Sequence, residues 1–188
     1  MKIIGVSGTN GAGKDTVGEM LAERHGWLFV SVSDILRQEL TRQGLPTDRH
    51  HTHQLSARWR RESGNGVLID KAVDFYNSQK GNFKGLAIAS LRNPGEADEI
   101  HNLGGKVMWV DADPKRRFKR ATSRQHGRAD DDKTFEEFIA EEEHQMHHSG
   151  DSATLNMAGV KAKADIFIDN NSDDLEEFIK KIERALSL

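Results

Sequence analysis

A glycine-rich segment near the start of the chain constrains its fold more than any other feature. The segment reads Gly8-Thr9-Asn10-Gly11-Ala12-Gly13-Lys14-Asp15-Thr16. The apolar residues 2–7 before it predict a buried strand, and residues 17–24 after it predict an amphipathic helix. A strand, a glycine-rich turn with a Gly-x4-Gly-Lys spacing and a helix, in that order, predict a loop that binds the phosphates of a nucleotide.

The residue types in this segment match the chemistry of phosphate binding. Gly8, Gly11 and Gly13 let the backbone turn inward without Cβ clashes, so that several N–H groups point to one place. These amides open onto a helix N-terminus, whose dipole favours an anion. Lys14 can reach the β- and γ-phosphates and offset charge during transfer. The residues expected to contact the donor nucleotide here are Gly8, Asn10, Gly11, Ala12, Gly13, Lys14, Asp15 and Thr16.

The residue after the lysine departs from the usual pattern of such loops, in which a Ser or Thr hydroxyl binds Mg²⁺. This chain has Asp15, with Thr16 behind it. Because hard cations prefer oxygen ligands, either residue can bind Mg²⁺ directly or through water. Asp15 also adds a negative charge beside a polyanion, and the metal would have to offset that charge. The sequence leaves open which of the two side chains contacts the metal.

Apolar stretches alternate with helical patterns along the rest of the chain. Further strands are expected at residues 27–32, 83–90, 106–112 and 164–169. Helices are expected at residues 35–43, 49–62, 67–78, 94–104, 114–123, 134–147 and 174–186, with a short one in 151–160. Caps are expected from Ser33 or Asp34 for the helix at 35–43, and from residues 170–173 for the last helix.

These strands lack clean alternation of apolar and polar residues, which is typical of strands that are covered on both faces. The pattern therefore predicts one α/β domain over residues 1–188, a three-layer α/β/α fold with a five-stranded parallel sheet.

Composition narrows the range of functions. The formal net charge of −3 is close to balance, so a large nucleic-acid-binding surface is not expected. The chain has no cysteine, which excludes a zinc-thiolate site and is compatible with a reducing cytosol. No apolar run approaches the roughly 20 residues of a membrane span, and the first strand begins too early for a signal peptide. We therefore expect a cytoplasmic protein that acts on a small molecule, with its oligomeric state left open.

Polar residues that directly follow strands are further candidates, because ligands of parallel sheets bind at the carboxyl ends of the strands. After the second strand, Asp34 can bind Mg²⁺ or orient an acceptor hydroxyl, and Arg37 can hold a phosphate of the acceptor. Arg92, after the third strand, can grip a phosphate with two bonds. In the alternative interpretation, Asp34 is a helix cap, Arg37 is a surface charge, and Arg92 pairs with Glu96.

A basic run follows the fourth strand and places four arginines on one face of a helix. They are Arg117, Arg120, Arg124 and Arg128. Such a face can cover a triphosphate and stabilise the charge that develops in transfer, although a solvated basic face or an RNA-binding surface would look the same. After the last strand, the backbone around Asn171 can hold the edge of a purine, and the alternative there is again a helix cap.

The order of these motifs resembles the small P-loop kinases, most closely the nucleoside monophosphate kinases and dephospho-CoA-kinase-like proteins. The motifs are Gly-Lys-Asp-Thr, Ser-Asp-x-x-Arg, Ser-Leu-Arg-Asn-Pro-Gly-Glu, Val-Asp-Ala-x-Pro-x-x-Arg-x-x-Arg, Arg-Ala-Asp-Asp-Asp and Ala-Asp-x-x-Ile-x-Asn. The resemblance implies an acceptor-binding helical region at about residues 34–79 and a LID at about residues 120–133. It also implies ATP as the donor, Mg²⁺ as the cofactor and a small nucleotide as the acceptor.

The resemblance also suggests roles for single residues. Catalytic roles fall to Lys14, Asp34, Arg92 and Arg124, and donor contacts beyond the loop to Arg120 and Asn171. Acceptor contacts fall to Asp34, Arg37, Arg92 and Arg128, and metal contacts to Asp15, Thr16 and Asp34. The third strand ends without the aspartate that this family often places there, which leaves Asp15 and Asp34 as the nearby acidic residues.

The favoured acceptor is a ribo- or deoxyribonucleoside monophosphate, with dephospho-CoA as the alternative in the same class. Two other classes stay open. One is an ATPase or nucleotide switch that acts with a protein or RNA, and the other is a non-catalytic nucleotide-binding module.

Overall fold

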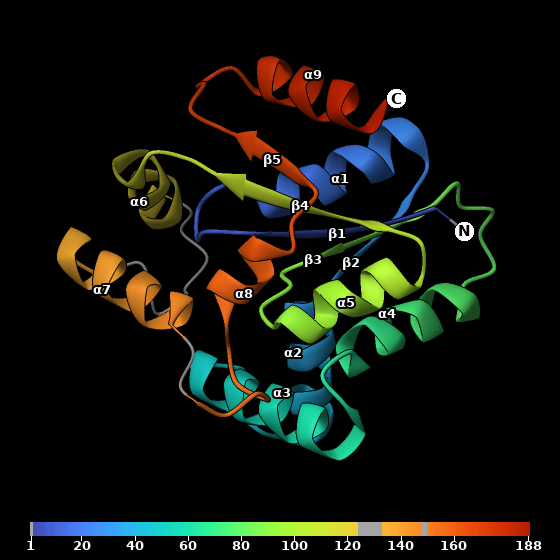
Figure 1. The fold of residues 1–188 in the computed structure, drawn as a ribbon, viewed down its shortest axis with the longest axis vertical. Coiled ribbons are helices and arrows are strands. Elements are labelled where there is room, and N and C mark those ends of the chain that lie inside the picture. Colours follow the sequence, from blue (N-terminus) through green and yellow to red (C-terminus); the bar gives the residue numbers. More distant parts are fainter. Residues whose placement is uncertain (1, 124–132, 148–149) are drawn as a thin grey trace.

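A computed structural model describes residues 2–123, 133–147 and 150–188 of the chain. Within these ranges five parallel strands form one sheet in the order β2-β3-β1-β4-β5, with helices on both faces (Figure 1). The strands are β1 (Ile3–Gly8), β2 (Leu28–Ser31), β3 (Leu86–Ala89), β4 (Lys106–Asp111) and β5 (Ile166–Asp169). The helices are α1 (Lys14–His25), α2 (Val32–Arg42), α3 (Arg49–Ser63), α4 (Val67–Ser78), α5 (Pro94–Asn102), α6 (Pro114–Ser123), α7 (Phe135–Met146), α8 (Met157–Ala162) and α9 (Leu175–Leu186).

The sheet is buried from both sides, which confirms the predicted three-layer α/β/α fold. Side chains of α1 and α9 form one apolar layer with the strands, centred on Leu21 and Phe178. Side chains of α2, α3, α4, α5 and α8 form the layer on the other face, centred on Leu68 and Trp109. Because helices cover both faces, the strands need no polar side, and β1 is buried over its whole length.

Strand β1 lies in the centre of the sheet and leads into the glycine-rich loop. It pairs with β3 on one side, with Gly5 opposite Ile88, and with β4 on the other, with Gly8 opposite Val110. The carboxyl ends of β3 and β4 therefore flank the loop. The predicted acceptor region at residues 34–79 forms most of α2 and all of α3 and α4. None of the described helices is both long and apolar enough to cross a membrane.

Three local predictions were wrong. Helix α2 begins directly after β2 with Ser31 at its N-cap, so neither Ser33 nor Asp34 caps it. Helix α9 is capped by Asp174, whose carboxylate accepts from the Glu176 N–H at 2.8 Å, and not by residues 170–173. The short helix predicted in residues 151–160 is α8, which begins only at Met157. Ser33 and Asp34 lie inside α2, and Asn170, Asn171 and Asp173 make tertiary contacts, which a local pattern does not reveal.

Candidate functional site

Glycines close the turn between β1 and α1 where no larger residue fits. Gly8 and Gly11 have φ angles of 142° and 74°, a region that other residues rarely adopt. A Cβ on Gly8 would lie 1.9 Å from the carbonyl oxygen of Val110, and one on Gly11 would lie 2.4 Å from that of Arg117. The loop is thus packed tightly against β4 and α6, and the predicted order of strand, glycine turn and helix is confirmed.

Lys14 begins α1 and folds back over the loop. Its Nζ donates a hydrogen bond of 2.7 Å to the carbonyl oxygen of Thr9. Removal of the ammonium from water, together with the nearby guanidinium of Arg92, lowers the pKa of Lys14 to about 8, and Asp15 opposes the shift. A cation held in this way gains a better partner when an anion enters the loop.

Asp15 and Thr16 follow Lys14 in the first turn of α1, where both are half-buried. A carboxylate and a hydroxyl are the hard oxygen ligands that Mg²⁺ accepts, so the pair fits a magnesium ion that also binds nucleotide phosphates. No cluster of three His, Asp or Glu side chains with metal-binding geometry is found in the part of the chain that the structure describes.

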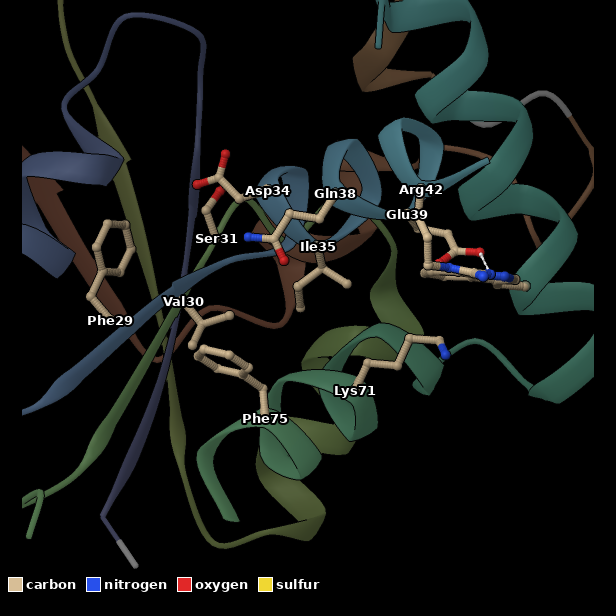
Figure 2. Close-up of a pocket in the computed structure, with 11 residues that line it drawn as sticks. Phe29, Val30, Ser31, Asp34, Ile35, Gln38, Glu39, Arg42, Lys71 and Phe75 are labelled. Carbon is tan, nitrogen blue, oxygen red and sulfur yellow. Dashed lines mark hydrogen bonds and ion pairs between the residues drawn. The ribbon is translucent and has the colours of Figure 1, made fainter. Parts of the chain in front are cut away.

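Asp34 and Arg37 lie together in the first half of α2, where Arg37 Nη2 donates to Asp34 Oδ1 at 2.5 Å. The carboxylate of Asp34 is more than half exposed, with a side-chain exposure of 57%. It lies at one end of a cavity of about 700 Å³ between β2, α2 and α4, and Figure 2 shows it at the opposite end from Glu39 and Arg42. The other residues that line the cavity are Phe29, Val30, Ser31, Ile35, Gln38, Trp59, Lys71 and Phe75.

Arg92 lies in the loop between β3 and α5, which is fixed from several sides. Its Nη1 donates to Oε1 of Gln145 at 2.7 Å, and its backbone N–H donates to Oε2 of Glu96, also at 2.7 Å. Ser90, two residues earlier, has a φ of 70°, a strained angle for a residue with a side chain. The alternative in which the Arg92 guanidinium pairs with Glu96 is wrong, because the Glu96 carboxylate binds Arg60 and the loop backbone.

Helix α6 brings two of the predicted arginines to the loop region. Arg117 is 3% exposed, and its Nη1 lies 3.3 Å from the carbonyl oxygen of Asn10. Arg120 donates at 2.9 Å to the carbonyl oxygens of Asn170 and Ser172. Arg120 therefore fastens the loop after β5, the same loop to which the sequence assigned the purine.

Asn171 lies in that loop and is bound by the residue that precedes α6, since its Oδ1 accepts the Asp113 N–H at 2.6 Å. The adjacent Asn170 donates from Nδ2 to the carbonyl oxygen of Ala12 at 2.8 Å, which ties the loop to the glycine turn. Arg124 and Arg128, and with them most of the predicted LID, lie outside the described residues.

Helix α3 adds two residues that were not among the predicted site residues. His53 faces the guanidiniums of Arg92 and Arg49, and burial together with these charges lowers its pKa to about 4, so it is neutral at pH 7. Arg49 forms an ion pair with Glu141 of α7. The charges on α3, on the loop after β3 and on α1 thus converge, which is the arrangement expected around an anionic ligand.

Two acidic residues of the site were also missed. Asp111 ends β4 and accepts a hydrogen bond of 2.7 Å from the Thr9 hydroxyl, so an acid does lie beside the loop, although on β4 and not on β3. The rule that sites follow strand ends could have found it. Glu142 binds Arg117 through both carboxylate oxygens. No sequence signal distinguishes Glu142 from the other acids of its helix.

The chain is similar to known proteins in both sequence and fold. A family model described as an AAA domain matches residues 4–147. The relatives include UPF0200 proteins of Pyrobaculum aerophilum, 28% identical over 99% of this chain and 97% of the relative, and of Pyrococcus horikoshii, 29% identical over 98% and 96%. A UPF0200 protein of Methanococcus maripaludis is 26% identical over 97% and 98%.

Solved structures share the fold at low identity. A shikimate kinase from Bacteroides thetaiotaomicron superposes with a TM-score of 0.62 at 15% identity, covering 99% of this chain and 98% of that one. The protein TT1252 from Thermus thermophilus gives 0.59 at 18%, over 98% and 96%. A gluconokinase from Sinorhizobium meliloti gives 0.56 at 15%, over 99% and 91%. The chain therefore shares its fold with these solved structures, two of which are named as kinases.

Proposed function

The chain belongs to the AAA domain family, and on that premise we propose that it is an ATP- and Mg²⁺-dependent phosphotransferase with a small nucleotide acceptor. The main support for the proposal is the set of charged residues around Lys14. Lys14 lies in a glycine loop with the guanidiniums of Arg92 and Arg117 near enough to lower its pKa, while Asp15 and Glu142 raise it. Three cations close to a helix N-terminus favour a strongly anionic ligand, and a polyphosphate is such a ligand.

Catalysis in this proposal rests on positioning and charge neutralisation. Lys14 and the loop amides hold the β- and γ-phosphates of ATP, and Arg120 and Asn171 hold the rest of the donor. Mg²⁺, held through Asp15, Thr16 or Asp34, offsets phosphate charge when bound. Arg37 and Arg92 hold the acceptor. Arg124 and Arg128 are proposed to close over the phosphates, which excludes water from the reaction.

A nucleoside monophosphate is the favoured acceptor, because Arg92, Arg49 and the neutral His53 form a surface that suits a phosphate monoester. The exposed carboxylate of Asp34 favours a second candidate, an acceptor hydroxyl, as in a dephospho-CoA kinase. The structural neighbours named shikimate kinase and gluconokinase are compatible with that chemistry. An ATPase or nucleotide switch in the cytoplasm, acting with a protein or RNA, is the candidate from another class.

A product screen tests these candidates. The protein is incubated with ATP and Mg²⁺ and with each nucleoside monophosphate, each deoxynucleoside monophosphate, dephospho-CoA, shikimate or gluconate, and the products are separated chromatographically. One strongly converted acceptor supports the kinase proposal and names the enzyme. Release of ADP at one slow rate with every acceptor contradicts it and favours the switch.

We expect the affinity for ATP to fall as the pH rises above about 8. The free protein loses the Lys14 proton with a pKa of about 8, whereas bound phosphates keep the ammonium protonated. Binding above that pH therefore takes up a proton, and linkage predicts a loss of roughly tenfold in affinity for each further pH unit. Calorimetric titration in two buffers of different ionisation enthalpy measures this uptake. Constant affinity from about pH 7 to about pH 9.5 would contradict the prediction.

Replacement of Arg92 by alanine is expected to raise the KM for the acceptor by roughly 10- to 100-fold, the value of a charge-assisted hydrogen bond. The KM for ATP should change less, since Lys14 and the loop amides remain. Steady-state kinetics with the acceptor found in the screen measure both constants. Arg58→Ala, on the exposed side of α3, is the control. An equal loss of affinity for both substrates would contradict the proposal that Arg92 binds the acceptor.

A further inference from the structure

One face of α7 is bound to the cations that surround the glycine loop. Glu142 Oε1 accepts from Arg117 Nη2 at 2.8 Å, and its Oε2 accepts from Arg117 Nη1. Gln145 Oε1 accepts from Arg92 Nη1 at 2.7 Å. Glu141 forms an ion pair with Arg49. These contacts come from three separate parts of the chain around the site, namely α6, the loop after β3 and α3.

Two of these arginines lie beside the glycine loop, since the charges of Arg92 and Arg117 both lower the pKa of Lys14. Arg117 is buried and reaches the carbonyl oxygen of Asn10 within the loop. Figure 1 shows α6 and α7 side by side next to the carboxyl end of β4, and the two helices pack through Phe118 and Phe138, with ring centroids 5.6 Å apart. Glu142 is near enough to Lys14 to raise its pKa, against the effect of Arg117.

A carboxylate that binds a guanidinium through both oxygens uses the same two N–H donors that a phosphate uses. Without an anion, Lys14, Arg92 and Arg117 repel one another, and Glu142 offsets that repulsion. When a polyphosphate enters, the same carboxylate is repelled by it. The carboxylates of α7 and the phosphates therefore compete for one set of cations.

We propose that the polar side chains of α7 occupy the arginines of the site in the free protein, and that the nucleotide phosphates must displace them. Glu142 holds Arg117, and Gln145 and Glu141 hold Arg92 and Arg49, until phosphate oxygens replace them. The inference rests on the proposed function, because it takes nucleotide phosphates as the ligand. It goes further in assigning to α7 control over the affinity for both substrates. If Glu142 instead holds Arg117 in position for phosphate binding, removal of the Glu142 charge lowers the affinity for phosphates and does not raise it. Binding measurements can therefore separate the two roles.

Three variants on α7 test the proposal. Glu142→Gln keeps the shape and removes the charge, Gln145→Glu adds a charge opposite Arg92, and Glu143→Gln is the matched control, since Glu143 is 72% exposed. Affinities for inorganic tripolyphosphate and for Mg-ATP are measured by calorimetry at constant ionic strength. We expect Glu142→Gln to bind both about tenfold more tightly, Gln145→Glu to bind them several-fold more weakly, and Glu143→Gln to match the wild type.

Equal or weaker binding by a folded Glu142→Gln protein overturns the proposal and makes Glu142 a positioning residue for Arg117. If circular dichroism shows that this variant does not fold, Gln145→Glu decides, and unchanged or tighter binding there overturns the proposal. Transfer assays keep the two proposals apart. The expected binding pattern without phosphoryl transfer contradicts the proposed function alone, and transfer without that pattern contradicts the role of α7 alone.

Discussion

Replacement of Lys14 by methionine is expected to slow phosphoryl transfer by about 10³-fold or more. The change keeps the length of the side chain and removes the one ammonium that lies inside the glycine loop. Charge builds up on the transferred group and the leaving oxygen during the reaction, and a fixed cation at that place stabilises the transition state more than the ground state. Single-turnover assays with the acceptor found in the product screen measure the effect.

The fold should survive this replacement. Desolvation already penalises the ammonium, as the pKa of about 8 shows, so its removal should not lower the melting temperature at pH 7. Lys115→Met, at an exposed position of α6, is the control for the loss of a surface lysine. Retained turnover in a well-folded Lys14→Met protein would contradict the proposal that Lys14 binds the donor phosphates.

Replacement of Glu96 by glutamine is expected to cost about 3–5 kcal/mol of unfolding free energy, the usual effect of breaking a buried ion pair. Arg60 and Glu96 have side-chain exposures of 1% and 0%, and Arg60 Nη2 lies 2.6 Å from Glu96 Oε1. Oε2 of Glu96 also accepts the backbone N–H groups of Arg92 and Asn93, at 2.7 Å and 3.1 Å. The variant leaves a buried guanidinium without its counter-charge and loosens the loop that carries Arg92.

Urea unfolding measures this change. Asp98→Asn on the same helix is the control, because the ion pair of Asp98 with Lys163 is largely exposed and such pairs contribute about 0–1 kcal/mol. The double variant Arg60→Met with Glu96→Gln should recover much of the loss, since no unpaired charge remains buried. A cost below about 1 kcal/mol for Glu96→Gln would show that water or another group replaces the carboxylate.

These two sites differ in how far the sequence predicts them. The donor loop is a contiguous motif, so the amino-acid sequence alone is enough to place Gly8, Gly11 and Lys14 in it. Glu96 was expected at most to pair with Arg92, four residues away. Its partner Arg60 lies 36 residues earlier in the chain, and no local pattern connects the two, because a buried arginine has the same sequence signature as an exposed one.

The acidic residues of the site show the same division. The sequence pointed to Asp34 and Asp15, which follow local motifs. Asp111 could have been found at the end of its strand, but its contact with Thr9 depends on β4 lying next to β1, and strand order is not encoded in the apolar pattern of either strand. Glu142 escaped because it lies between two other glutamates, Glu141 and Glu143, and only the packing of α7 on α6 selects it.

The amino-acid sequence by itself determined the alternation of strands and helices, the parallel sheet covered on both faces, and the loop that holds Lys14. These follow from local backbone conformation and from the spacing of apolar residues, which are both visible within short stretches of the chain. The tertiary structure alone decided which polar groups meet: Arg60 with Glu96, Arg92 with Gln145, and Arg117 with Glu142. Such pairs form where separate elements pack and exclude water, and the free energy of a charge depends on those distant neighbours and not on its place in the sequence.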